Sequence, residues 1–91
     1  MPQGGFSVEG DLDASGLRFA VAVARFNAHV TGPLHDGCRE ELLGRGAADA
    51  SVVSIEVPGC FELPIVAKTL AQSGRFDAVI CIGAVIRGDT P

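Results

Sequence analysis

Three short clusters hold the side chains of this chain that are best suited to bind a ligand. Residues 25–27 (Arg-Phe-Asn), 58–64 (Pro-Gly-Cys-Phe-Glu-Leu-Pro) and 87–91 (Arg-Gly-Asp-Thr-Pro) each follow a mostly apolar run. An aromatic ring, a carboxylate and a glycine-containing turn with a hydroxyl suit a ligand that combines a polar ring with a phosphate. Ligands of open parallel α/β sheets bind outside the carboxyl ends of the strands, so we expect the clusters to form one site.

Phe26 has two interpretations. As a site residue, its ring stacks on a heteroaromatic ligand, an interaction of about 0.5–1.5 kcal/mol beyond burial. As a structural residue, it packs against the first turn of the following helix, for which Asn27 and Thr31 are the candidate N-caps. Its position alone favours the structural interpretation.

In the second cluster, Phe61 and Glu62 lie in the first turn of a predicted helix that follows Pro58-Gly59. Backbone N–H groups in a first helical turn are unpaired and can hold anionic or carbonyl oxygens, and Glu62 can accept hydrogen bonds from ligand hydroxyls. An acid at this place also stabilises the helix dipole by about 0.3–1 kcal/mol, and this structural role is favoured for Glu62 taken alone. Cys60 has no adjacent histidine that would support it as a nucleophile.

The third cluster offers backbone N–H groups and the Thr90 hydroxyl in a tight turn, which suits a phosphate. Asp89 would contribute only its N–H, with its carboxylate pointing away. An ordinary turn with Arg87 in a surface ion pair is an equal alternative. Arg87-Gly88-Asp89 also spells an adhesion tripeptide, but the N-terminus lacks the features of a secretion signal.

A metal site is not expected. His35 and Cys38 share a helix face, but a zinc site needs three or four ligands and no others are near. The alternative that both are solvent-facing polar residues of the helix is favoured over a metal site, although Cys38 also falls on the apolar stripe of that helix.

Five regular elements must position the clusters. Apolar runs at 17–24, 51–57 and 78–86 predict buried parallel strands, and segments 29–45 and 61–72 predict helices. This alternation with short connections predicts an α/β fold with a parallel sheet and right-handed crossovers. The expected inner faces of the helices are Val30, Leu34, Cys38, Leu42 and Leu43, then Leu63, Val66, Ala67 and Leu70.

Composition limits the partners. The chain has 91 residues and a net charge of −4, with no run of Lys or Arg, which argues against nucleic acid and anionic membranes. Its longest apolar run, 78–86, is shorter than the about 20 residues of a membrane helix. The three separated cysteines, without a C-x-x-C pair, indicate reduced thiols and a cytoplasmic protein.

The expected organisation is one domain, residues 1–91, with residues 1–16 as an N-terminal arm that carries a short edge strand at 6–9. A parallel sheet needs both faces covered, yet no helix follows the run at 78–86. We therefore expect a bare face, and interpret the chain as the front part of a longer domain or as one completed by another chain.

Taken together, A-R-F-N at 24–27, V-P-G-C-F-E-L-P at 57–64 and I-G-A-V-I-R-G-D-T-P at 82–91 resemble the motifs of the lumazine synthase family, and so does their spacing. The resemblance covers nearly the whole chain but little over the first half of a family chain. It implies a flavodoxin-like α/β fold, a three-layer sandwich truncated here after the third core strand. It also implies condensation of 5-amino-6-(D-ribitylamino)uracil with 3,4-dihydroxy-2-butanone 4-phosphate to 6,7-dimethyl-8-ribityllumazine in riboflavin biosynthesis, without a metal or organic cofactor.

The resemblance implies a role for each site residue. Phe26 would stack on the uracil ring beside Asn27, and Glu62 would bind the ribityl hydroxyls. The remaining contacts would come from Cys60 and Phe61 for the ribityl chain, from the backbone of Ala84, Val85 and Ile86 for the pyrimidine edge, and from Asp89 and Thr90 for the butanone phosphate.

Family members assemble as pentamers or larger shells, and the strand at 6–9 would pair with a neighbouring subunit. The family's acid/base histidine follows the T-P that is Thr90-Pro91 here, so it lies beyond this sequence, and such catalysis contributes about 10²–10⁴-fold. Two functions are therefore open: a lumazine synthase, or a catalytically impaired module that binds ribityl and phosphate groups or takes part in oligomer assembly.

Overall fold

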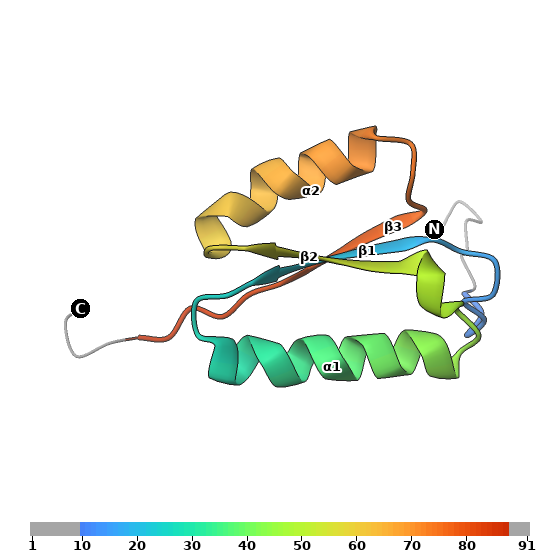
Figure 1. Cartoon of the computed structure of the whole chain (residues 1–91), viewed down its shortest axis with the longest axis horizontal. Coiled ribbons are helices and arrows are strands. Elements are labelled where there is room, and N and C mark those ends of the chain that lie inside the picture. Colours follow the sequence, from blue (N-terminus) through green and yellow to red (C-terminus); the bar gives the residue numbers. More distant parts are fainter. Residues whose placement is uncertain (1–9, 88–91) are drawn as a thin grey trace, which may run out of the picture.

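The computed structural model describes residues 10–87, which form an open parallel sheet between two helices (Figure 1). The sheet has the order β2-β1-β3, with α1 on one face and α2 on the other. This order matches the first three strands of the flavodoxin-like order 2-1-3-4-5 and confirms the α/β prediction. The elements are β1 (Phe19–Ala24), α1 (Ala28–Gly44), β2 (Val52–Val57), α2 (Leu63–Gln72) and β3 (Ala78–Ile82), with 3₁₀ turns at Asp49–Ser51 and Cys60–Glu62.

The central strand β1 is buried along its whole length because it has a neighbour on each edge and a helix on each face. It pairs in parallel with β2 from Phe19↔Val52 to Ala24↔Val57, and with β3 from Phe19↔Ala78. This environment explains why its sequence is a continuous apolar run with no alternation.

The core is divided by the sheet into two layers. Phe19 and Val21 of β1 pack toward α1, where Cys38, Leu42 and Leu43 cover them. Ala22 and Ala24 pack on the opposite face with Leu63, and Val66 and Leu70 cover them. The predicted inner face of α2 is confirmed at these three residues.

The third strand is shorter than predicted, because β3 ends at Ile82 and residues 83–87 are irregular. The apolar run to Ile86 gave no sign of this end. A strand needs a hydrogen-bonded neighbour, and β1, the partner of β3, ends at Ala24, where the chain turns into α1. The first strand likewise begins at Phe19, and Leu17 before it is exposed.

The start of α1 also differs from the prediction. Asn27 occupies the N-cap position, but its side chain makes no capping hydrogen bond. Thr31, the other candidate cap, is buried inside the helix, and its hydroxyl donates to the Ala24 carbonyl at 2.8 Å. The inward stripe therefore includes Thr31, whereas Leu34, predicted to be inside, is 51% exposed.

The surface of the edge strand β3 on the α1 side is partly uncovered, as the prediction of a bare face requires. Leu34, Ile80 and Ile82 line an open groove of about 480 Å³ between α1 and β3. No helix among residues 10–87 is long and apolar enough to cross a membrane. The predicted edge strand at 6–9 lies outside the described residues.

Candidate functional site

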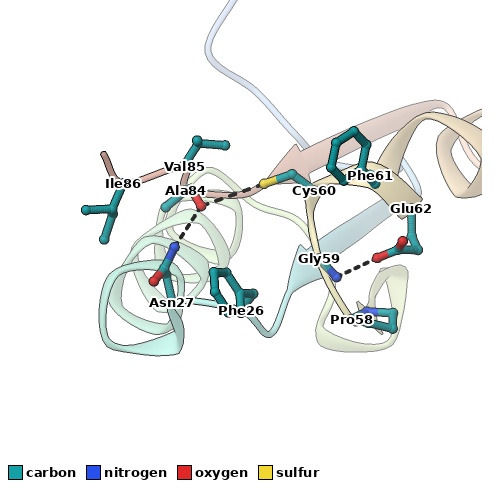
Figure 2. A pocket seen from close by; sticks show the side chains of 10 residues that line it. All are labelled: Phe26, Asn27, Pro58, Gly59, Cys60, Phe61, Glu62, Ala84, Val85 and Ile86. Atoms are coloured by element: carbon teal, nitrogen blue, oxygen red, sulfur yellow. Dashed lines mark hydrogen bonds between the residues drawn. The ribbon is translucent and has the colours of Figure 1, made fainter. Parts of the chain in front are cut away.

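The carboxyl end of the sheet carries a pocket of about 420 Å³ to which all three strand ends contribute (Figure 2). Every predicted site residue up to Ile86 lines it, whereas Asp89 and Thr90 lie outside the described residues. The lining consists of Phe26 and Asn27 after β1, Pro58, Gly59, Cys60, Phe61 and Glu62 after β2, and Ala84, Val85 and Ile86 after β3.

The Ala84 carbonyl joins the three strand ends. Asn27 Nδ2 donates to this oxygen at 3.0 Å, and the Cys60 thiol donates to it at 3.8 Å from Sγ (Figure 2). The ends of β1 and β2 are joined directly, since Phe26 N–H donates to the Pro58 carbonyl at 3.0 Å. The pocket wall at 84–86 is therefore held by side chains from the other two strand ends.

Gly83 allows the chain after β3 to pass close to the start of α2. A Cβ at this position would lie 2.6 Å from Cys60 Sγ, closer than real Cβ atoms approach, and 3.1 Å from Leu63 Cδ1, which is a tight contact. Pro58 and Gly59 belong to the second predicted cluster but were assigned no ligand contact, and the close approach at Gly83 was not predicted. Their signal was present in the P-G and I-G dipeptides, which indicate turns or close backbone approach.

Glu62 has a structural role, although a different one from the predicted stabilisation of the helix dipole. Its Oε1 accepts the Gly59 N–H at 2.7 Å and so closes the turn between β2 and α2 (Figure 2). Among residues 10–87, its second oxygen has no hydrogen bond within the protein. That oxygen is available to a ligand hydroxyl, so the structural role and the predicted binding role are compatible.

The two aromatic rings of the pocket are not part of the core. Phe26 is 69% exposed and Phe61 is 96% exposed. The interpretation of Phe26 as a packed residue at the start of α1 is therefore wrong. Exposed aromatic rings beside an apolar pocket indicate a surface that a ligand or another chain covers.

The chemistry available in the described pocket is binding and orientation. Its ionisable side chains are Glu62 and Cys60, and the histidines of the chain, His29 and His35, lie on α1 away from the pocket lining. Ligand oxygens can meet the Glu62 carboxylate and nearby backbone N–H groups.

His35 and Cys38, considered above as possible metal ligands, lie on α1 and do not line the pocket. His35 Nε2 is 2.7 Å from Ser54 Oγ. Cys38 packs against the core, which confirms its predicted place on the inner stripe of the helix and contradicts the solvent-facing alternative, and burial raises the pKa of its thiol. Within residues 10–87, no three His, Cys, Asp or Glu side chains gather so as to hold a metal ion.

Comparison with known proteins agrees with the motifs at this pocket. The family model for 6,7-dimethyl-8-ribityllumazine synthase matches residues 16–91. A curated 6,7-dimethyl-8-ribityllumazine synthase of Desulfotalea psychrophila (strain LSv54 / DSM 12343) is 50% identical over 84 residues, which are 92% of this chain and 54% of the relative. The protein of the same name from Desulfatibacillum aliphaticivorans is 49% identical with the same coverage.

The chain spans about half the length of these two curated relatives. The family match covers β1, β2 and β3 and every described residue that lines the pocket. On these grounds the chain belongs to the 6,7-dimethyl-8-ribityllumazine synthase family.

Proposed function

We propose that the pocket binds 5-amino-6-(D-ribitylamino)uracil for its condensation with 3,4-dihydroxy-2-butanone 4-phosphate. The product is 6,7-dimethyl-8-ribityllumazine, and the reaction is a transferase step of riboflavin biosynthesis that releases phosphate and water. Family membership supports this proposal. The observation that carries it is the meeting of three strand ends around one pocket that offers an exposed aromatic ring and a carboxylate.

Each part of the substrate has a candidate partner. The exposed ring of Phe26 stacks on the uracil, and the free oxygen of Glu62 accepts a hydrogen bond from the ribityl chain, which Cys60 and Phe61 flank. The backbone at 84–86 meets the pyrimidine edge. Asp89 and Thr90, outside the described residues, would hold the butanone phosphate.

These roles accelerate the reaction by holding two substrates in the correct mutual orientation, which converts a bimolecular step into one that is effectively unimolecular. Proton transfer needs another group, because the described pocket lining contains no histidine. The resemblance implies that this group is a histidine following Thr90-Pro91.

Self-association is part of the proposal. Phe61 at the pocket and Ile65, one turn along α2, are 96% and 69% exposed, which leaves apolar surface for a second copy to cover. We propose a cytoplasmic pentamer or larger shell, with small-molecule substrates and no nucleic acid or membrane partner. In it, residues 1–91 belong to one domain, and residues 1–16 form an arm toward a neighbouring subunit.

A second function is a module that binds ribityl and phosphate groups or takes part in assembly, without turnover. It is favoured by the lack of a histidine among the described residues that line the pocket. Calorimetric titration of the chain with 6,7-dimethyl-8-ribityllumazine, followed by a turnover assay with both substrates, separates the two. Binding with turnover supports the enzyme, and binding alone supports the module. A folded chain that does not bind the product would contradict the enzyme and the binding module, and would leave only the role in assembly.

A further inference from the structure

We infer that Asn27 is a positioning residue, which shapes the pocket through the Ala84 carbonyl and does not itself bind substrate. The inference rests on the proposed function only for the ligand that occupies the pocket. It changes the role predicted from the sequence, in which Asn27 was a substrate-binding residue.

The backbone of Asn27 is unusual. Among the described residues, it is the only non-glycine residue with a positive φ, 64°, in the left-handed region. Asparagine tolerates this region better than most residues. Asn27 is the last of the three residues between the end of β1 at Ala24 and the start of α1 at Ala28, and its side chain takes no part in capping the helix. The amide is thus free to reach across the sheet.

The partner of this amide is a backbone group that no strand pairing holds. Ala84 lies beyond the end of β3 at Ile82, and its carbonyl accepts the Asn27 amide at 3.0 Å in a half-buried setting (Figure 2). The backbone just before Asn27 is held in place, since the Arg25 and Phe26 N–H groups donate to the Val57 and Pro58 carbonyls at 2.8 and 3.0 Å.

The direction of the Ala84 carbonyl determines the direction of the next N–H group. The Ala84 carbonyl and the Val85 N–H belong to one planar trans peptide, so they point in opposite directions. With the carbonyl held by Asn27, and more weakly by Cys60, the Val85 N–H is fixed relative to the pocket. Asn27 therefore sets the backbone edge at 84–86 that the proposed function assigns to the pyrimidine.

Two variants separate the backbone of Asn27 from its amide. Asn27→Gly keeps the left-handed conformation and removes the donor. Asn27→Asp keeps the shape of the side chain but replaces the donor with an oxygen that repels the carbonyl. Thr69→Ala is the control, because it removes a hydrogen bond from a side chain to the backbone, Thr69 to the Ile65 carbonyl, away from this pocket.

The first readout needs no ligand. Amide NMR of the 91-residue chain should show altered shifts at Val85 and Ile86 in both Asn27 variants. The amides of β1 should stay unchanged, and Thr69→Ala should leave residues 84–86 as in the wild type. If Asn27→Gly loses its folded spectrum, Asn27→Asp decides by the same criterion. Unchanged Val85 and Ile86 amides in a folded Asn27 variant overturn the inference.

The second readout is calorimetric binding of 6,7-dimethyl-8-ribityllumazine. Loss of one hydrogen bond that orders the pocket should weaken binding about 3- to 10-fold in both variants. Weaker binding with unchanged Val85 and Ile86 amides in the free protein would indicate direct ligand contact and overturn the inference. If the wild type does not bind, the proposed function fails, while the ligand-free spectra still decide the role of Asn27.

Discussion

Glu62 Oε1 and the Gly59 N–H group lie within 2.7 Å of each other, so the carboxylate that the sequence offers for ligand binding also closes the turn that begins α2. A single side chain thus connects helix stability with the pocket. Substitutions at this position can separate the two effects because glutamine retains an oxygen acceptor and alanine does not.

Glu62→Gln should keep the turn and lower the affinity for the ligand. We expect its free energy of unfolding to lie within about 0.5 kcal/mol of the wild type, because the amide oxygen still accepts the Gly59 N–H. Binding of 6,7-dimethyl-8-ribityllumazine should fall by about 1 kcal/mol or more as the charged acceptor is lost. Glu62→Ala should in addition lose about 0.5–2 kcal/mol of stability. Urea unfolding and calorimetry measure both quantities, and full binding by Glu62→Gln would exclude the proposed contact to the ribityl chain.

Phe26→Ala should weaken binding without affecting the fold. Because the ring is 69% exposed, its removal should change the free energy of unfolding by no more than about 0.5 kcal/mol. Loss of stacking should lower the affinity for the same ligand by about 0.5–1.5 kcal/mol. Phe26→Tyr, which keeps an aromatic face, is the matched control and should bind nearly as well. A loss of stability above about 1 kcal/mol would instead restore the structural interpretation of this ring.

Gly83→Ala should destabilise the protein. The added Cβ would meet Cys60 Sγ at 2.6 Å and Leu63 Cδ1 at 3.1 Å, so either the Cys60 side chain or the chain after β3 must shift. We expect a cost of about 1–3 kcal/mol in urea unfolding. Adding Cys60→Ala removes the nearer obstacle and should recover part of that loss. Strict additivity of the two substitutions would show that the contact has no energetic role.

Asp77 should contribute to the acid sensitivity of the fold. Its carboxylate accepts the Arg18 side chain and the Arg18 N–H at 2.8 Å, and these bonds lower its pKa from 3.8. A lowered pKa in the folded state gives stability that is present above the pKa of the unfolded chain, and that is lost as the pH falls through the folded value. The relevant window therefore lies around and below pH 3.8.

Asp77→Asn tests this linkage. The variant should unfold more easily than the wild type at neutral pH, and the difference should shrink as the pH is lowered below about 4. Arg18→Leu should remove only part of the effect, because the Arg18 backbone N–H still donates to Asp77. Urea titrations across this range measure the dependence. A difference that is the same at every pH would show that Asp77 does not titrate with folding.

The sequence allowed the strands, the helices and most of the pocket to be predicted because these features follow from local patterns. The continuous apolar run of β1 is what a strand covered on both faces and both edges requires. Residues 26–27, 60–62 and 84–86 lie together in the structure because the ends of parallel strands meet at one edge of the sheet.

Other features depend on partners distant in sequence. The end of β3 at Ile82 follows from the end of β1, and apart from Gly83 the residues up to Ile86 are apolar and give no sign of it. Thr31 can be buried because its hydroxyl donates a hydrogen bond to the Ala24 carbonyl. The helical spacing of apolar residues does not indicate this bond. The amide of Asn27 likewise has its partner 57 positions away, at Ala84.

Because β1 lies between the other two strands, the pocket at their ends is complete only when all three strands are paired. β2 and β3 do not pair with each other, so the two sides of the pocket are connected through β1, through the start of α2 against Gly83, and through the bonds to Ala84. These contacts join distant parts of the chain, and such contacts form late because loop closure costs entropy. A ligand that binds only the assembled pocket will therefore stabilise all three strands together. A rise in the unfolding midpoint on adding ligand would report cooperativity across the domain.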